Sequence, residues 1–211
     1  LRGFNRKILA IGFKNLVIKN KGLKKLISKN LKKKLTYQDI GFNIGPVINS
    51  SGRIGKANHV VELFLSQNDD EIETIINKMN NHNVIRKRIE QENLGLIDFK
   101  KYYNKNVILI YNKEFHEGVI GIIAAKLSQI FNKPCFIMTE SQDLLKCSIR
   151  SGNNLKINKT INKLIANELI ITGGGHNEAG GFSAKKANLA GIENFLNKEY
   201  KNFKTKKHYY F

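Results

Sequence analysis

The feature that most constrains the fold is a set of three apolar segments in the second half of the chain. Val107 to Tyr111 and Cys135 to Thr139 are short and strongly apolar, which is typical of buried strands. Val119 to Phe131, between them, is long enough for an apolar helix. A strand, a helix and a second strand in this order predict a βαβ unit, and therefore a protein of the α/β class.

The remainder of the second half predicts further elements around the same sheet. Leu144 to Ile149 is interpreted as a strand paired with the preceding one across the turn Glu140 to Asp143. Asn158 to Asn167 and Leu189 to Tyr200 have the spacing of helices. Thr172 to Phe182, TGGGHNEAGGF, is interpreted as a glycine-rich loop followed by a short strand. We therefore expect a mixed sheet accompanied by helices.

The first half is expected to be helical and basic. Apolar positions from Arg6 to Leu35 recur at roughly helical spacing, and we expect Gly12 and Gly22 to break this region into short helices. Gly41 to Gly55 contains four glycines and a proline, so we expect a structured loop there instead of a regular helix. His59 to Leu65 is apolar and is predicted to be helical.

A long helix is expected to follow. Asn68 or Asp69 is suited to its N-cap, and acidic residues occupy the first turn, where the helix dipole favours them. Apolar positions from Ile72 to Met79 form one stripe, and helical character persists towards Phe99. Its length would approach ~45 Å at 1.5 Å per residue. A helix this long and mostly polar usually connects two domains.

The composition favours a partner that is a polyanion. The chain has 211 residues, of which 41% are hydrophobic, so it can bury a core. Lys and Arg together number 36 against 17 Asp and Glu, a net charge of +19. Nucleic acid is one explanation, and the lysine bias of an A+T-rich genome is another. The absence of any acidic residue before Asp39 favours the first.

Cysteine usage and the chain ends indicate a cytoplasmic protein. Cys135 and Cys147 lie in apolar surroundings without a CxxC pair, as reduced thiols do. There is no apolar run of about 18 residues and no secretory signal, so we expect neither a membrane span nor export. The sequence begins at Leu1 without Met, and we expect it to be a piece of a longer chain.

Three segments carry residues suited to phosphate. Asn49 to Arg53 places an arginine among small residues, and Ser148 to Gly152 places a hydroxyl and the guanidinium of Arg150 on one face of a strand, at the edge of the sheet. Gly173 to His176 allows close backbone approach and directs an imidazole to the same place. Taken singly, the first two segments are explained better as ordinary surface loops, and the third is the most informative.

Several other site types are excluded. No Gly-Lys-Ser/Thr follows the glycines, so there is no P-loop, and no strand-to-helix turn with a later acid supports a dinucleotide fingerprint. The five histidines show no HxxxH, HxH or HExxH spacing, so we expect no metal site within the chain. His116 precedes an apolar helix, where a role in orienting the loop is as good an explanation as catalysis.

In this order, these segments resemble the RecJ family of single-stranded-DNA-specific exonucleases, in the DHH phosphoesterase superfamily. GPVINSSGRIG is similar to the family's GPRINAAGRLG, EFHEGVIGIIAAKL to WHxGVIGIVASRL, KCSIRSG to KGSGRSI, and GGGHNEAGGF to FGGHxxAAGL. The resemblance implies four parts, namely the end of a DHH domain at 1–67, a connecting helix at 68–104, a DHH-associated substrate-binding domain at 105–201 and a basic tail at 202–211.

The resemblance also implies roles for individual residues. Arg53, Ser148 and Arg150 would form the pocket for the DNA 5′-phosphate, with Asn49 as a further substrate-binding candidate. A loop of three residues would face the scissile phosphate, with its histidine as the catalytic candidate: Gly174, Gly175 and His176. The family's metal-binding aspartates would lie upstream of Leu1, so Mn²⁺ or Mg²⁺ would be bound by the absent DHH half and not by this chain.

The implied function is the strand-gripping part of a 5′→3′ exonuclease of DNA repair and recombination. Single-stranded DNA is the expected partner, and a separate chain carrying the DHH half is a second candidate partner. The alternatives are a non-catalytic nucleic-acid-binding remnant of a split gene and a small-nucleotide phosphodiesterase of the same superfamily. The sequence departs from the family at Val47, which replaces Arg, and at Cys147 and Ile149, which replace glycines. We expect the bulk of Ile149 to narrow the approach of a DNA backbone.

Overall fold

The computed structural model describes residues 3–31, 34–152 and 155–203. They divide into two compact units, Leu1–Arg88 and Ile89–Phe211, and the division falls within one long helix. Arg2, Lys32, Lys33 and most of the expected basic tail lie outside the described residues.

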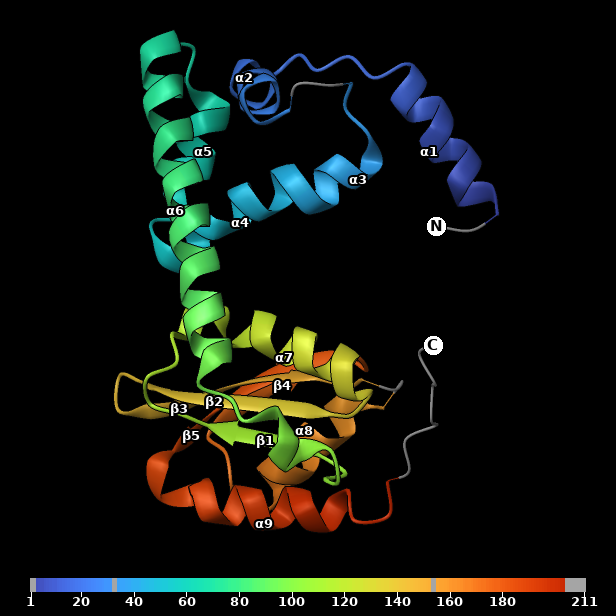
Figure 1. The fold of residues 1–211 in the computed structure, drawn as a ribbon, viewed down its shortest axis with the longest axis vertical. Coiled ribbons are helices and arrows are strands. Elements are labelled where there is room, and N and C mark those ends of the chain that lie inside the picture. The colour runs from blue at the N-terminus through green and yellow to red at the C-terminus, as the bar shows by residue number, and fades with distance from the viewer. Residues whose placement is uncertain (1–2, 32–33, 153–154, 204–211) are drawn as a thin grey trace. The chain divides into compact units, whose positions relative to one another are not determined.

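In its described residues, the first unit is helical (Figure 1). Its elements are α1 (Phe4–Lys14), α2 (Lys21–Asn30), α3 (Tyr37–Asp39), the π-helical segment η1 (Ile40–Ile44), α4 (Gly45–Ile54), α5 (Asn58–Leu65) and the first part of α6 (Asp69–Gly95). A buried cluster joins α2, η1, α4, α5 and α6; its members are Leu26, Ile44, Val47, Leu63, Ile72, Ile75, Ile76 and Met79. Val47, which departs from the family pattern, is therefore a core residue.

Two expectations for this unit are wrong. Gly12 and Gly22 lie inside α1 and α2, and the break between these helices falls at residues 15–20. Gly22 serves close packing, because a Cβ there would lie 1.9 Å from the Leu63 carbonyl oxygen. The expected loop at 41–55 is also helical. Pro46 stands in the first turn of α4, where a proline costs no hydrogen bond, and the buried Ser50 hydroxyl donates to Val47 O (2.6 Å).

Helix α6 begins where the sequence predicts and ends earlier. Asn68 caps it, since its Oδ1 accepts from the backbone N–H groups of Asp70 (2.9 Å) and Glu71 (3.2 Å). The helix has 27 residues, or about 40 Å at 1.5 Å per residue, and stops at Gly95. The shorter 3₁₀ turn η2 (Phe99–Tyr102) follows as a separate element.

Lysines of α2 hold α6 by ion pairs. Lys21 Nζ lies 2.8 Å from Asp69 Oδ2, and Lys25 Nζ lies within 3.6 Å of both Asp69 and Glu73. Lys29 pairs with Glu73 as well and donates to Asn77 Oδ1 (2.7 Å). These partners lower the pKa of the Asp69 and Glu73 carboxyls, chiefly through the hydrogen bonds from Lys21 and Lys29. Part of the basic charge of the first half is thus used inside the fold.

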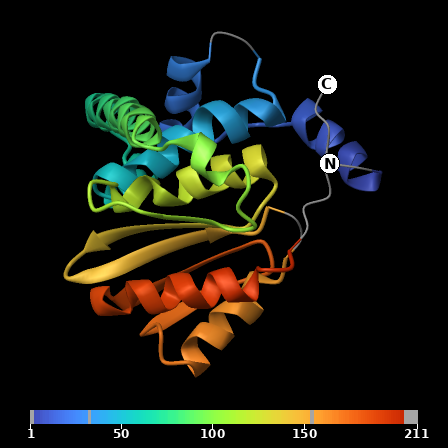
Figure 2. The same ribbon diagram turned by 60° about the horizontal axis from the view of Figure 1, so that its bottom comes forward.

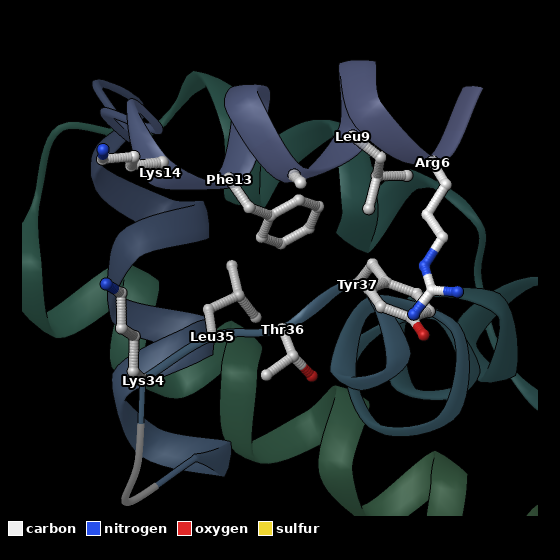
Figure 3. Close-up of a pocket in the computed structure, with 9 residues that line it drawn as sticks. Arg6, Leu9, Phe13, Lys14, Lys34, Leu35, Thr36 and Tyr37 are labelled. Atoms are coloured by element: carbon white, nitrogen blue, oxygen red, sulfur yellow. The ribbon is translucent and has the colours of Figure 1, made fainter. Parts of the chain in front are cut away.

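A hollow of about 590 Å³ lies between α1 and the segment that leads into α3. Figure 3 shows Leu9 and Phe13 projecting from α1 towards Leu35 and Tyr37, with basic side chains at its edges. No residue of α1 is buried, and Phe4, Ile8 and Ile11 are 75%, 55% and 64% exposed. The apolar face of α1 formed by Phe4, Ile8 and Ile11 is therefore uncovered within the described structure.

The second unit confirms the predicted α/β class and the mixed sheet. Its elements after η2 are β1 (Ile108–Tyr111), α7 (Glu117–Phe131), β2 (Cys135–Ser141), β3 (Leu144–Arg150), α8 (Ile157–Ala166), β4 (Thr172–Gly175), β5 (Ala179–Lys185), η3 (Lys186–Asn188) and α9 (Leu189–Glu199). The five strands are ordered β1-β2-β3-β5-β4. Strands β1 and β2 are parallel, as the βαβ prediction requires, and the other pairs are antiparallel.

Helices cover the two faces of this sheet unequally. Helix α7 packs on β2 and β3 from one side, and α8 packs on β4 and β5 from the other, with α9 on the same side as α8 (Figures 1 and 2). The core on the α8 side takes alternate strand residues such as Phe136, Cys147, Ile149 and Phe182. The glycine-rich segment expected to be a loop is instead the hairpin β4–β5, with a three-residue turn at His176 to Glu178.

Candidate nucleic-acid-binding site

The pairing of β3 sets the direction of Ser148 and Arg150. Successive residues of a strand point to opposite faces, so Ser148 and Arg150 share one face, as the sequence predicts. In the structure this face is the one that α7 packs on, and Ile149 faces the α8 side. A Cβ at Gly121 of α7 would lie 3.0 Å from Ser148 Oγ and 3.8 Å from Arg150 Nη2. Strand β3 is the central strand of the sheet, and Arg150 is its last residue, as the sequence predicts for the end of a strand.

Arg150 and His176 line one hollow of about 400 Å³ in the second unit. Arg150 comes from the end of β3, and His176 from the turn between β4 and β5. The other walls come from the two residues after Arg150, from the far side of the hairpin turn and from the last turns of α7. These wall residues are Ser151 and Gly152, Glu178 and Ala179, and Ala125, Ser128 and Gln129. Two of the three segments singled out in the sequence are therefore brought together by the fold.

Backbone hydrogen bonds hold the turn that carries His176. Ser151 N donates to Glu178 O (2.9 Å), which ties the turn to the end of β3. Ile157 N donates to Asn177 O (3.1 Å), which ties it to the start of α8, and His176 N donates to Ala179 O (2.8 Å). Both sides of the turn are anchored, so the imidazole is presented from a fixed position.

The hydrogen bonding of His176 determines which nitrogen can face a ligand. Its Nδ1 accepts from the backbone N–H of Glu178 (3.3 Å) and therefore carries no proton in this arrangement. A neutral imidazole then has its proton on Nε2, which makes Nε2 a hydrogen-bond donor. The exposed ring and the guanidinium of Arg150 together offer donors to an anion in the hollow.

Glycines make close approach possible at two points beside the hollow. Gly152 has φ +70°, and a Cβ there would lie 2.2 Å from the Lys133 carbonyl oxygen. A Cβ at Gly175 would lie 2.4 Å from Ala179 O and 2.5 Å from Gly180 Cα. A larger residue at Gly152 would displace the end of β3, and one at Gly175 would displace the hairpin turn. Both positions therefore require glycine for close backbone packing.

The remaining predicted residues lie elsewhere. Ser148 is not among the residues that line this hollow, since its hydroxyl meets α7 at Gly121. Gly174 lies on the neighbouring exposed face of β4 and β5. Asn49 and Arg53 are in the first unit, Asn49 exposed on α4 and Arg53 in its last turn.

A histidine pair supports the end of α4 that carries Arg53. The rings of His59 and His82 stack with centroids 5.6 Å apart, and a Cβ at Gly55 would lie 2.3 Å from His82 Cε1. Burial, and secondly the charge of His59, lower the pKa of His82. Gly55 ends α4, so the turn after Arg53 packs directly on α6.

The bulk of Ile149 does not narrow the site, contrary to the expectation. Ile149 is fully buried in the core on the α8 side, together with Cys147. His116, left open between two roles, caps α7 by accepting from Gly118 N at its Nδ1 (3.0 Å). Burial raises the pKa of both thiols, and Cys135 and Cys147 are unpaired, in agreement with reduced cysteines.

Sequence reasoning missed the contribution of α7 to the hollow. Ser128 and Gln129 come from its last turns, and no local pattern marks them as binding residues. Ser151 and Gly152 could have been found, because they continue the segment that contains Arg150. Within the described ranges, no group of three or more His, Cys, Asp or Glu residues could hold a metal ion, and none of the helices there combines the length and apolarity needed to cross a membrane.

These features define a class of domain. Residues 104–202, which include the sheet and the hollow, match the DHHA1 domain family. Most of the chain is similar to RecJ proteins, as its motifs indicate. It is 31% identical over 177 residues to the single-stranded-DNA-specific exonuclease RecJ of Salmonella typhimurium, covering 78% of this chain and 31% of the relative. It is 30% identical to RecJ of Escherichia coli, covering 72% of this chain and 28% of that relative.

Solved structures confirm the fold. The crystal structure of RecJ in complex with Mn²⁺ from Thermus thermophilus superposes with a TM-score of 0.83 at 23% identity, covering 96% of this chain and 30% of that one. The chain thus spans about a third of the length of the RecJ proteins from Salmonella typhimurium and Escherichia coli. Mn²⁺ and Mg²⁺ are named in the RecJ structures from Thermus thermophilus.

Proposed function

We propose that this chain is the strand-gripping part of a RecJ-type 5′→3′ exonuclease that acts on single-stranded DNA in repair and recombination, in the cytoplasm. The observation that carries the proposal is the hollow lined by both Arg150 and His176. The names of its sequence relatives, which are single-stranded-DNA-specific exonucleases, agree with it.

The residues of the hollow have separate parts in this proposal. Arg150 binds the 5′-phosphate, because a guanidinium donates two parallel hydrogen bonds to phosphate oxygens. His176 donates from Nε2 to the scissile phosphate, and the glycines Gly174 and Gly175 let the DNA backbone approach. Ser148, on the same face of β3 beneath α7, is proposed as a further ligand of the 5′-phosphate on the strength of its motif. Arg53, with Asn49 in the same segment, is proposed as a further phosphate ligand on the strength of its motif.

Hydrolysis needs a second component in this proposal. The cation that activates water is assigned to a DHH half, on a separate chain or a further part of this protein, and the described residues contribute the grip on the strand and the donor on His176. The uncovered apolar face of α1 supports contact with such a component, because isolated helices shorter than about 12 residues are marginal in water. With the large positive charge, this predicts salt-dependent binding without cleavage by the chain alone.

The test compares 5′-phosphorylated and 5′-hydroxyl single strands, bound to the purified chain in titrations at several salt concentrations. Arg150→Ala is expected to abolish the preference for the phosphorylated end, and Arg150→Lys to retain part of it, since lysine keeps the charge but loses the fork. Lys159→Ala, on α8 at the opposite face of the sheet, is the control with the same loss of charge.

Two results would contradict the proposal. One is rapid hydrolysis of single strands by the chain alone with Mn²⁺ or Mg²⁺. The other is a preference for the 5′-phosphate that Arg150→Ala leaves unchanged.

A further inference from the structure

A second surface lies beside the hollow, on the same face of the sheet. Alternate residues of β3, β5 and β4 point to the α7 side, and the register aligns Lys146 with Ser183, and Ser183 with Thr172. Helix α7 packs on β2 and β3, whereas α8 packs on β4 and β5 from the opposite side. The α7-side face of the hairpin therefore borders an open hollow of about 410 Å³, and it is called the β4–β5 shelf here: Thr172, Gly174, Gly181 and Ser183.

The shelf is flat and polar. A Cβ added at Gly174 would meet no atom within 4 Å, so a side chain there would enter open space. Gly181 beside it also lacks a side chain, and Thr172 and Ser183 supply hydroxyl groups. A surface without side chains lets an extended backbone lie close to the sheet, and hydroxyls can bond to its phosphate or sugar oxygens.

One cation is held at the edge of the shelf. Lys146 Nζ donates to Ser183 Oγ (3.1 Å), and no carboxylate of the described residues forms an ion pair with it. The ammonium keeps two further N–H groups for a ligand. Lys146 and Arg150 are on the same face of β3, four residues apart, which is about 13 Å at 3.3 Å per residue. One strand of DNA can therefore contact both cations through different phosphates.

We propose that the β4–β5 shelf carries the sugar–phosphate backbone of the DNA strand beyond its 5′-end, with Lys146 as a second phosphate-binding residue. This inference rests on the proposed function, since it takes Arg150 as the position of the first phosphate. The shelf presents hydroxyls and bare backbone and no side chain that reads a base edge, so this contact is independent of sequence.

The experiment measures binding of single strands by the full chain and two variants. Lys146→Ala is expected to weaken binding of a 5′-phosphorylated strand of about ten nucleotides roughly five- to tenfold at low salt, and to reduce the slope of log K against log salt by about 0.7, the value for one phosphate contact. Binding of a 5′-phosphorylated mononucleotide, which is too short to reach Lys146, stays unchanged. The control Lys159→Ala leaves unchanged the ratio of the affinity for the long strand to the affinity for the mononucleotide.

A steric variant tests the shelf independently of charge. Gly174→Val places a side chain in open space on an exposed strand, where valine is compatible with β structure, so the fold is retained. It should weaken binding of the long strand and spare the mononucleotide. The inference is overturned if Lys146→Ala and Gly174→Val lower the affinity for the long strand no more than Lys159→Ala does. If Arg150→Ala fails to change the 5′-phosphate preference while Lys146→Ala still weakens the long strand, the proposed function fails and the shelf remains.

Discussion

Replacing Ile149 by alanine should destabilise the second unit without improving DNA binding. Ile149 is 0% exposed and lies opposite Phe136 on β2 and Gly180 on β5. It packs in the same core as Ile157 and Ile161 of α8. Its side chain points away from Arg150, so shortening it opens space in the core and not in the hollow.

The magnitude follows from what the substitution removes. Ile149→Ala deletes three carbon atoms from a fully buried site, which costs about 2–2.5 kcal/mol in transfer free energy. The cavity left behind adds to this, because a sheet paired on both sides of β3 cannot collapse into it, and the total loss is about 3–4 kcal/mol. The control Ile165→Ala, where the side chain on α8 is 43% exposed, should cost about 1 kcal/mol or less.

Hydrogen exchange of the β2 and β3 amides is the suitable assay, since it reports on this unit directly. Ile149→Ala should speed the exchange of these amides by two to three orders of magnitude, as about 3–4 kcal/mol requires. Affinity for single strands should not rise. A variant with unchanged exchange and tighter binding would refute the assignment of Ile149 to the core and restore its bulk as an obstacle at the site.

Three further predictions concern charge and thiols. The lysines of α2 lower the folded-state pKa values of Asp69 and Glu73, whose ordinary values are near 3.8 and 4.5. The stabilisation from these carboxylates is therefore complete above the ordinary values and is lost as pH falls through the folded-state values. In an acid titration followed by circular dichroism, the first unit of Asp69→Asn should unfold at a higher pH than that of the unsubstituted chain. Cys135 and Cys147 should resist alkylation at neutral pH in the native protein and react in urea, as mass spectrometry can show, because burial raises both pKa values. Glu178→Gln removes a carboxylate from the edge of the hollow and should tighten strand binding about two- to threefold at low salt, with no gain at high salt.

The elements from β1 to β3 were predictable because their signals are local, whereas the hairpin β4–β5 was expected to be a loop. The apolar runs that became β1, α7 and β2 have the lengths and flanking residues that distinguish strands from helices. The connection between two strands by an apolar helix implies the parallel pair. The alternation within β3 was sufficient to place Ser148 and Arg150 on one face. It also places Ile149 on the other face, so the sequence alone could have shown that Ile149 does not narrow the approach of DNA.

The first unit shows where local signals mislead. Glycine and proline in residues 41–55 predict a loop, yet the segment is helical because its apolar residues, Ile44 and Val47, join the core beneath α6. Tertiary packing outweighs the helix propensity of single residues, which amounts to about 1 kcal/mol for a glycine. Gly22 is likewise kept within α2 by the backbone of Leu63, which leaves no room for a side chain.

The order of residues along the chain determined the α/β class, the long helix after Asn68 and the donor groups of the segments that carry Arg53, Arg150 and His176, since these depend on spacing and residue type. Only the tertiary structure decided that Arg150 and His176 share a hollow, that α7 completes it, and that Lys146 stands beside a bare strand pair. The reason is that pairing β3 with β5 and docking α7 on one face join segments that are distant in sequence, and no local pattern encodes which faces a helix leaves open.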